Sequence, residues 1–346
     1  MSNTKQYGAI VVIIVIIAAV GIGLYVFLPG EAPPPEGEAL KIAQIETGDL
    51  SFAWARVNHE SLLRVAEALN TTETPIQVSA SFNVGPAEFG SVAEAYILDG
   101  YDVLVCNDVT YEGTVATLAE DYPNVYFIGS GGWTSDSATG NVSVMAWDIW
   151  KGYYLAGIIA GSMTSSGIIG WISAFDFPDN ARIFNMLMAG AQAYNASVTG
   201  QYLFTGDWHD AVKSATAASS LIDAGADVLA ATGQGLVHGV LAECLTRGVY
   251  AIGYDWDEYE LAPAVILTSV LYIRDAYLTS LLQDVLDGTF GGTFLTLGIA
   301  DGATGIAPYH DLEEAIPQDA QDMVDDVIAD INAGTFTLPA VTTTMP

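Results

Sequence analysis

Residues 141–160, NVSVMAWDIWKGYYLAGIIA, are the stretch that decides the fold of this chain. An extended run, NVSVMAW, is followed by a helical pattern in which large apolar residues alternate with small ones. The small residues are Gly152, Ala156, Gly157 and Ala160, and the apolar ones are Tyr153, Leu155, Ile158 and Ile159. Blocks of alternating strand and helix patterns lie before and after this stretch. We therefore expect it to carry the chain from one α/β lobe into a second, with a ligand cleft between them.

The composition bounds the class of protein. A folded part of roughly 300 residues suits two domains of about 150 residues each. The chain has 41 acidic and 9 basic residues, a formal charge of −32, and the basic residues are scattered singly. Without a basic patch we expect no nucleic-acid partner, which excludes repressors built on a two-lobed architecture. A salty habitat, an acidic habitat or simple solubility could each explain the acidity.

Little in the sequence suggests an enzyme or a cofactor. Cys106 and Cys244 fall in different predicted lobes, so we expect two unpaired thiols rather than a disulfide. The four histidines do not occur at metal-ligand spacing; they are His59, His209, His238 and His310. No GxSxG motif is present. We expect a protein that is not an enzyme and that holds no metal or other cofactor.

The N-terminus carries an uncharged apolar run, GAIVVIIVIIAAVGIGLYVFL, at residues 8–28. It is long enough to span a bilayer as a helix, and Lys5 before it places residues 1–7 in the cytoplasm. We favour a retained anchor over a cleaved signal peptide, whose apolar region is usually only about 7–15 residues long. A pilin-like stem is a third possibility. Residues 29–38, PGEAPPPEGE, follow as a stiff linker.

The first lobe alternates strand and helix patterns. We predict strands at 40–45, 77–83, 101–109 and 124–130, and helices at 54–69, 89–98 and 111–121. Such alternation indicates a parallel sheet, which binds ligands at the carboxyl ends of its strands. Four residues that could contact a ligand, Asp49, Phe52, Asn107 and Asp108, follow predicted strands. We expect them at one edge of the sheet.

The second lobe repeats this pattern. We predict helices at 150–163, 210–223, 236–247 and 317–333, and a further helix that begins at Pro178 and Asp179. We predict strands at 168–173 and 264–272, one strand within 197–208, one within 226–235, and one that ends at Asp255. GYDVLVCND at 100–108 resembles GADVLAATG at 225–233, which favours two lobes of one topology. The glycine-rich TGQG at 232–235 could hold a phosphate, but without the three-glycine fingerprint a tight turn is favoured.

These patterns give the domain bounds. We expect lobe 1 to comprise 39–147 plus about 270–305, and lobe 2 to comprise 148–269 plus about 306–335. Residues 336–346 are predicted to form a loose Thr/Pro tail. Glycosylation-type triplets start at Asn70, Asn141 and Asn195, and they weakly favour an exterior location.

Several of these stretches resemble the basic membrane protein (BMP) family. They are NVSVMAWDIWKGYYLAGIIAG, GIIGWISAF, LIDAGADVLAATGQG and YAIGYDWDE, and the similarity extends over residues 40–335. The family consists of surface or periplasmic substrate-binding proteins of ABC importers that bind purine nucleosides or related purines. The resemblance implies a type I periplasmic-binding-protein fold, with two Rossmann-like lobes, a three-crossing hinge, and a purine held between aromatic rings.

The resemblance also implies roles for particular residues. The family's D-x-S-F turn matches Asp49, Ser51 and Phe52; Phe52 would stack on the base, and Asp49 would accept hydrogen bonds from its N–H groups. Asp255 matches the acidic residue that accepts from ribose hydroxyls, and Asn107 matches a strand-end ligand contact. The chain departs from many members at three positions, with Gly48, Ala53 and Tyr272 in place of an aspartate, an asparagine and a ribose-binding lysine. A free nucleobase or another aromatic metabolite therefore stays open as ligand.

The second ring of the sandwich has several candidates. Trp171, Phe175 and Phe177 come first, followed by Trp133 and Trp256, although core packing is an alternative for any such ring. The candidate ligand-binding residues are therefore Asp49, Ser51, Phe52, Asn107, Asp108, Trp171, Phe175, Phe177, Gly233, Gln234, Asp255 and Trp256.

We therefore predict an extracellular solute-binding protein of an ABC importer, anchored in the cytoplasmic membrane by its N-terminal helix. Its partners would be a purine nucleoside or related small molecule and an ABC permease. Closure would occur around crossings near 146–147 and 269–271. The alternative is a surface structural or filament subunit that kept the binding fold, which the apolar helix and linker would suit. A nucleoside hydrolase, testable by release of free base, is a third possibility.

Overall fold

The computed structural model describes residues 39–51 and 53–346, which form two compact units. Unit 1 comprises the described residues up to Met145 together with Leu278–Leu295, and unit 2 comprises Ala146–Tyr277 and Thr296–Pro346. The chain thus passes from one unit to the other three times. The predicted anchor, with the segments on either side of it, lies outside the described residues. Among the described residues no helix is long and apolar enough to cross a membrane.

Unit 1 is built on a six-stranded sheet with the order β11-β5-β4-β3-β1-β2, in which all pairs are parallel. Its strands are β1 (Leu40–Ile45), β2 (Ile76–Ser81), β3 (Val103–Cys106), β4 (Tyr126–Gly129), β5 (Val142–Met145) and β11 (Phe294–Leu295). The α-helices are α1 (Ala53–Leu69), α2 (Pro86–Leu98), α3 (Glu112–Asp121) and α8 (Arg274–Leu286), and the first turn of α8 belongs to unit 2. Two 3-10 helices, η1 (Val109–Tyr111) and η2 (Ser135–Ser137), complete it. All four residues of β3 are buried, as expected for a strand covered on both faces.

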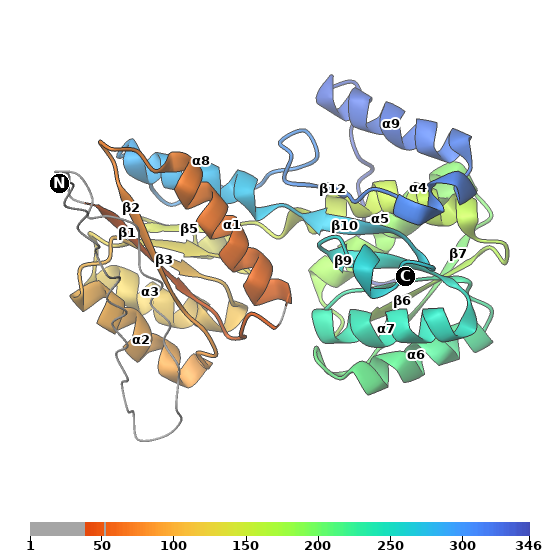
Figure 1. The fold of residues 1–346 in the computed structure, drawn as a ribbon, viewed down its shortest axis with the longest axis horizontal. Helices are drawn as coiled ribbons and strands as arrows, with labels where there is room; N and C mark the ends of the chain where they lie inside the picture. The colour runs from red at the N-terminus through yellow and green to blue at the C-terminus, as the bar shows by residue number, and fades with distance from the viewer. Residues whose placement is uncertain (1–38, 52) are drawn as a thin grey trace, which may run out of the picture. The chain divides into compact units, whose positions relative to one another are not determined.

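Unit 2 has a second six-stranded sheet with the order β12-β10-β9-β8-β6-β7. Its strands are β6 (Ile168–Ser173), β7 (Thr199–Phe204), β8 (Val228–Ala231), β9 (Tyr250–Asp255), β10 (Ile266–Tyr272) and β12 (Thr304–Ile306). The helices are η3 (Asp148–Lys151), α4 (Tyr153–Met163), α5 (Pro178–Tyr194), α6 (Ala211–Asp223), α7 (Gln234–Arg247), η4 (Tyr259–Leu261), η5 (His310–Ala315) and α9 (Gln318–Asn332). Helices α4 and α5 cover one face of the sheet, and α6 and α7 cover the other (Figure 1).

The bounds of the two units differ from the predicted lobe bounds where the chain crosses between the units for the second and third time. Residues 270–277 and 296–305 belong to unit 2, although the sequence pattern placed them in lobe 1. The reason is that β10 continues through Tyr272 in the second sheet, and β12 pairs with it in an antiparallel register. Strands as short as β11 and β12 carry no periodic signal, so the sequence did not predict either of them.

The glycines of α4 have a packing role against α5. A Cβ atom on Gly157 would lie 2.2 Å from the carbonyl oxygen of Leu187, and one on Gly190 would lie 2.0 Å from that of Tyr154. The two helices therefore approach backbone to backbone, which only glycine allows at these positions. Gly157, one of the small residues of the stretch 141–160, thus serves to seat α4 on α5.

Two local predictions can be compared with the structure directly. Cys106 and Cys244 are free, buried, and in different units, as expected. The C-terminal segment, in contrast, is not loose. The side-chain amide of Asn185 donates hydrogen bonds to the carbonyl oxygens of Thr342 and Thr344, both at 3.0 Å, and the Tyr202 hydroxyl donates to the carbonyl of Pro346 at 3.1 Å. These contacts hold the segment against α5 and β7.

Candidate functional site

Asn107 follows β3 and lies in a buried polar network at the carboxyl edge of the first sheet. Its side-chain nitrogen donates to Glu46 Oε1 at 2.7 Å, and its Oδ1 accepts from the Ser130 hydroxyl at 2.7 Å. The side chain of Gln44 also donates to Glu46 Oε1, at 2.5 Å. Asn107 is only 2% exposed. One N–H group and the oxygen of the amide are engaged within the protein, so Asn107 orders this edge of the sheet; its predicted contact with a ligand stays a prediction.

Two aspartates lie at the same edge and remain accessible. Asp108 accepts from the Thr47 hydroxyl at 2.9 Å, which joins the loops after β1 and β3, and from the backbone N–H of Thr110 at 2.8 Å. Asp49 accepts from both the hydroxyl and the backbone N–H of Ser51, and these hydrogen bonds hold the pKa of Asp49 below its ordinary value. An ionised carboxylate in a partly exposed turn suits a ligand that offers N–H donors. Phe52, the predicted stacking ring, lies outside the described residues.

Asp255, at the end of β9, is buried in an ion pair. Its two carboxylate oxygens accept from Arg274 Nη2 at 2.9 and 3.0 Å, and Asp255 and Arg274 are each 1% exposed. Arg274 also donates to the carbonyl of Tyr272 at 3.0 Å and lies over its ring. Burial raises the pKa of Asp255, and the guanidinium opposes that shift. Arg274 thus pairs with the carboxylate that was predicted to contact a ribose.

Sequence reasoning missed Arg274 as the partner of Asp255. Arg274 lies two residues after Tyr272, which stands in place of the ribose-binding lysine of many family members. The Tyr272 hydroxyl itself donates to the carbonyl of Ala146 at 3.0 Å. A basic residue close behind a strand end in so acidic a chain was the available signal. Trp256, the other candidate near this strand end, is partly buried.

Glu258 is a second buried carboxyl close to this strand end. It is 1% exposed; its Oε2 accepts from the backbone N–H of Tyr254 at 2.8 Å, and its own N–H donates to the Ser269 hydroxyl at 3.0 Å. Burial raises the pKa of Glu258 well above its ordinary value, with Asp255 and Asp257 adding to the shift. Glu258 is therefore held protonated in the folded protein at pH values where an exposed glutamate is ionised.

Glu258 should make stability fall as the pH rises. Above about pH 4.5 it ionises in the unfolded chain but stays protonated in the folded one, so the unfolded state binds fewer protons. The free energy of unfolding then decreases with pH up to the raised pKa, by at most about 1.4 kcal/mol per pH unit. In urea unfolding from about pH 5 to about pH 7.5, Glu258→Gln should show a shallower decline than the wild type. Glu67→Gln, at an exposed position on α1, should keep the wild-type slope, and equal slopes for all three proteins would contradict the prediction.

The second sheet presents a group of partly exposed rings at its carboxyl edge. Phe175 and Phe177, after β6, are 39% and 49% exposed. Trp208, in the loop after β7, lies with its ring centroid 5.7 Å from that of Phe175 and 6.1 Å from that of Phe177, the latter pair being nearly parallel at 19°. We call these three residues the aromatic cluster. Phe175 and Phe177 were predicted; Trp208 was missed, although it follows a strand end at the same edge.

The aromatic cluster is supported from beneath by buried polar groups. The side-chain amide of Asn180, 1% exposed, donates to the carbonyl oxygen of Phe175 at 2.8 Å. The Thr232 hydroxyl donates to the Ser173 hydroxyl at 2.8 Å, which ties the ends of β6 and β8 together. Gly233 has a φ of 104°, and a Cβ atom there would lie 2.8 Å from the Trp208 ring. The TGQG segment is therefore a tight turn that seats Trp208. The side chain of Gln234, another predicted contact, lies outside the described part of the structure.

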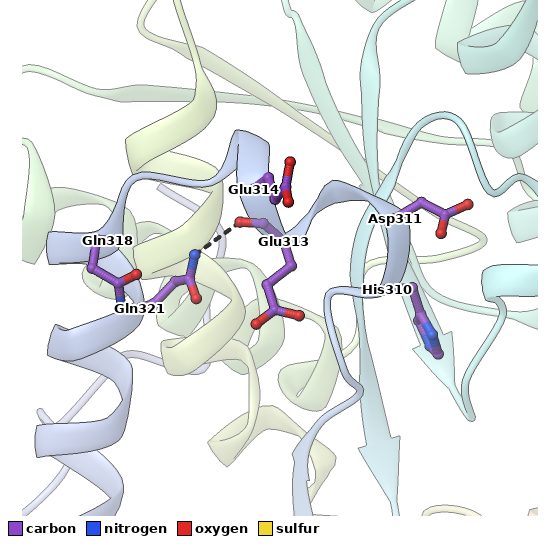
Figure 2. Close-up of a pocket in the computed structure, with 6 residues that line it drawn as sticks. All are labelled: His310, Asp311, Glu313, Glu314, Gln318 and Gln321. Atoms are coloured by element: carbon purple, nitrogen blue, oxygen red, sulfur yellow. Dashed lines mark hydrogen bonds between the residues drawn. The ribbon is translucent and has the colours of Figure 1, made fainter.

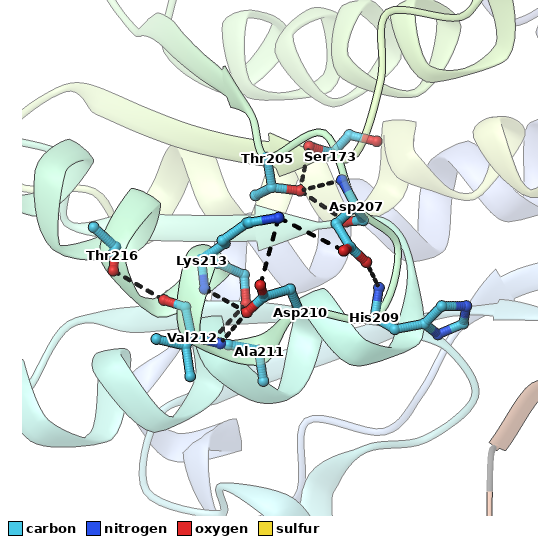
Figure 3. Close-up of polar contacts among 10 residues, drawn as sticks. Ser173, Thr205, Asp207, His209, Asp210, Ala211, Val212, Lys213 and Thr216 are labelled. Carbon is cyan, nitrogen blue, oxygen red and sulfur yellow. Dashed lines mark hydrogen bonds and ion pairs between the residues drawn. The ribbon is translucent and has the colours of Figure 1, made fainter.

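The loop that carries Trp208 is fixed by polar contacts on both sides (Figure 3). Asp207 accepts from the backbone N–H of His209 at 2.9 Å, and Asp210 caps α6 by accepting from the N–H groups of Val212 and Lys213. The ammonium group of Lys213 lies 3.6 Å from Asp207 and 3.5 Å from Asp210. Trp208 is thus held at the edge of the sheet by the residues on either side of it.

Trp171 and Trp133, two of the predicted stacking rings, lie in the core. Trp171 lies within β6 and is fully buried, with Phe184 and Phe204 against its ring. Trp133 is 4% exposed, and its indole N–H donates to the carbonyl of Asp108 at 2.8 Å. Rings of this size are usually buried for their area. A tryptophan inside a strand that helices cover on both faces cannot contact a ligand at the strand ends.

A separate surface hollow of about 540 Å³ lies on η5 and the start of α9 (Figure 2). It is lined by His310, Asp311, Glu313, Glu314, Gln318 and Gln321. His310 is paired with Asp257 at 2.7 Å, and the side-chain amide of Gln321 donates to the carbonyl of Glu313 at 2.9 Å. No group of three His, Cys, Asp or Glu side chains that could hold a metal occurs in the described part of the chain. The hollow contains none of the candidate ligand-binding residues.

Comparisons with known proteins agree with this architecture. A family model described as ABC transporter substrate-binding protein PnrA-like matches residues 53–333. A purine-binding protein of Brucella abortus is 28% identical over 89% of this chain and 85% of its own length. A Haloferax volcanii protein named as an ABC transporter glucose-binding protein is 26% identical over 86% of this chain and 72% of its own. The fold is similar to that of an ABC transporter solute-binding protein from Conexibacter woesei, with a TM-score of 0.71 and 22% identity over 88% of this chain and 99% of that one.

Proposed function

The chain belongs to the basic membrane protein family of PnrA-like ABC transporter substrate-binding proteins, and we propose that it binds a purine nucleobase or nucleoside in a cleft between its two lobes. Proteins of this class work outside the cytoplasm, in the periplasm or at the cell surface, and deliver a small molecule to a permease. The filament subunit considered above is not favoured, because the family match covers most of the chain.

The aromatic cluster is the observation that carries this proposal. Half-exposed rings at the carboxyl edge of a parallel sheet, held by a fixed loop and a tight turn, offer a flat apolar face where such sheets bind ligands. Stacking a base on such rings contributes about 1–3 kcal/mol. The first lobe would supply Phe52 as the opposite ring and Asp49 as an acceptor for base N–H groups. The name of the Brucella abortus relative also favours a purine.

The sugar contributes little to recognition in this proposal. Asp255 is paired with Arg274, and the Tyr272 hydroxyl donates to a backbone carbonyl; the proposal therefore assigns neither group to a ribose. Binding energy would then come mainly from the base. Adenine or guanine should therefore stabilise the protein about as much as the corresponding nucleoside does.

A ligand panel tests the proposal. Thermal melting of residues 39–346 with nucleobases, nucleosides, glucose and amino acids should show a shift of several degrees with purines, because a ligand at about 100 times its Kd adds about 2.7 kcal/mol to stability. Trp208→Ala and Phe52→Ala should each weaken binding roughly tenfold or more. Leu245→Ala, on α7 and 43% exposed, is the matched control and should bind like the wild type.

The outcomes separate the ligand classes. A shift with glucose alone would replace the purine by a sugar, in line with the name of the Haloferax volcanii relative. A purine shift that survives Trp208→Ala and Phe52→Ala would place the ligand elsewhere. If no compound of the panel raises the melting temperature, the proposal is overturned.

Anchoring in the membrane is a further part of the proposal. The uncharged run at residues 8–28 supports the anchor, because it is long enough to span a bilayer. The full chain should sediment with membranes at high salt, and a chain lacking residues 1–38 should not. A full chain that stays in the supernatant would contradict the anchor.

A further inference from the structure

The three Asn-X-Ser/Thr triplets differ sharply in their surroundings. Asn141 immediately precedes β5, and its side-chain nitrogen donates to the carbonyl oxygens of Tyr122 at 3.1 Å and Val125 at 2.6 Å. Both of its N–H groups are therefore engaged. Ser143, the third residue of this triplet, is fully buried in β5, and its hydroxyl accepts from the N–H of Thr293 at 3.2 Å. An enzyme that must reach the amide and the hydroxyl of this triplet cannot do so in the folded protein.

Asn195 has the opposite environment. It follows the last residue of α5, and its Oδ1 accepts from the N–H of Ser197 at 3.1 Å and from the Ser197 hydroxyl at 2.7 Å. Ala196 and Ser197 are exposed. Within residues 39–51 and 53–346, the side-chain nitrogen of Asn195 donates to no group. The amide nitrogen and the hydroxyl of this triplet are thus both within reach from solvent.

Asn70 is also accessible. It lies in the loop between α1 and β2, and Asn70, Thr71 and Thr72 are all exposed. Its Oδ1 accepts from the N–H of Ile76 at 2.9 Å, which orients the amide without using its nitrogen. In the part of the chain that the structure describes, the Asn70 side-chain nitrogen has no acceptor. A substituent on that nitrogen would leave the bond to Ile76 intact.

We propose that Asn70 and Asn195 are N-glycosylation sites of this protein and that Asn141 is not. The donor is an oligosaccharide linked through phosphate to a polyprenyl lipid. The Asn side-chain nitrogen forms a bond to C1 of the first sugar, and the bond between C1 and the phosphate oxygen breaks, with that oxygen keeping the electron pair. The displaced amide proton goes to the transferring enzyme and then to water. The folded lobes of an exported substrate-binding protein meet such a donor on the outer side of the membrane.

Glycopeptide mass spectrometry of the full chain, isolated from the membranes of its native cells, tests this assignment. We expect glycan on the peptides of Asn70 and Asn195 and an unmodified Asn141. In gel electrophoresis of protein made in the same cells, Asn70→Gln and Asn195→Gln should each increase mobility, and the double variant should run as one unglycosylated band. Glycan on Asn141, or bare asparagine at Asn70 or Asn195, would overturn the proposal.

Asparagine to glutamine at Asn141 is the control for the claim that this side chain serves the fold and carries no glycan. Asn141→Gln removes two hydrogen bonds to the turn that precedes β4, so it should lower the midpoint of urea unfolding while leaving mobility unchanged. Asn195→Gln should alter mobility in protein made with glycan. In protein made without glycan it should lower that midpoint less than Asn141→Gln does, because the hydrogen bonds that it removes are to the exposed Ser197. If Asn141→Gln changes mobility, the assignment fails. These readouts do not involve the ligand, so they stand or fall independently of the purine proposal.

Discussion

Replacing Arg274 by methionine should lower the free energy of unfolding by about 3–5 kcal/mol, because it leaves the buried Asp255 without its partner. Asp255 and Arg274 are each 1% exposed, and Arg274 Nη2 contacts both carboxylate oxygens. An isolated carboxylate in such a site must protonate or draw water inward, and either response costs stability. Urea unfolding monitored by tryptophan fluorescence measures the loss.

Two variants make this test specific. Arg182→Met removes an exposed ion pair with Asp179, in which the side chains are 40% and 34% exposed, and it should cost at most about 1 kcal/mol. The double variant Asp255→Asn/Arg274→Met should recover part of the loss, because the uncompensated charge is gone. An Arg274→Met protein as stable as Arg182→Met would show that the buried pair contributes nothing.

Gly190→Ala should destabilise unit 2 by about 1–3 kcal/mol or more through overpacking between α4 and α5. The added Cβ would lie 2.0 Å from the carbonyl oxygen of Tyr154 and 3.1 Å from the Cα of Gly157. Backbone atoms cannot move aside as a flexible side chain can, so the helices must separate. This cost exceeds the gain of up to about 1 kcal/mol that alanine brings to a helix interior.

The matched control is the same substitution where space is open. A Cβ on Gly113, in α3, would meet nothing within 4 Å, so Gly113→Ala should be neutral or slightly stabilising. The two variants are compared by their urea midpoints at equal slope. If Gly190→Ala unfolds at the wild-type midpoint, the close approach of the two helices is not needed for stability.

The sequence alone predicted most of the longer elements of the fold, but not α8, β11 or β12. Strand β1 was predicted with its observed bounds, and α1, α5 and α6 were predicted to within about two residues at the ends that the sequence defined. These elements carry strong local patterns, either a continuous apolar run or a 3.6-residue period opened by a capping residue such as Asp210. The family resemblance rests on the same stretches, and the family match confirms it.

What the sequence could not supply was which candidate residues are accessible. Phe175 and Phe177 remain exposed, whereas Trp171 is buried in β6, and Trp208 from a neighbouring loop completes the cluster instead. A ring inside a strand and a ring after a strand look alike in composition. Their difference depends on how far the strand continues before the chain turns.

The sequence by itself thus determined the alternation of strands and helices, the two-lobed architecture and the polar strand ends, because residue periodicity and turn chemistry act over a few neighbours. Only the tertiary structure decided that Asn107 is engaged by Glu46 and Ser130, and that Asp255 is neutralised by Arg274. Such pairings join residues separated by 19 to 61 positions along the chain. Burial and partner choice over those separations follow from packing, and no local pattern of residues encodes them.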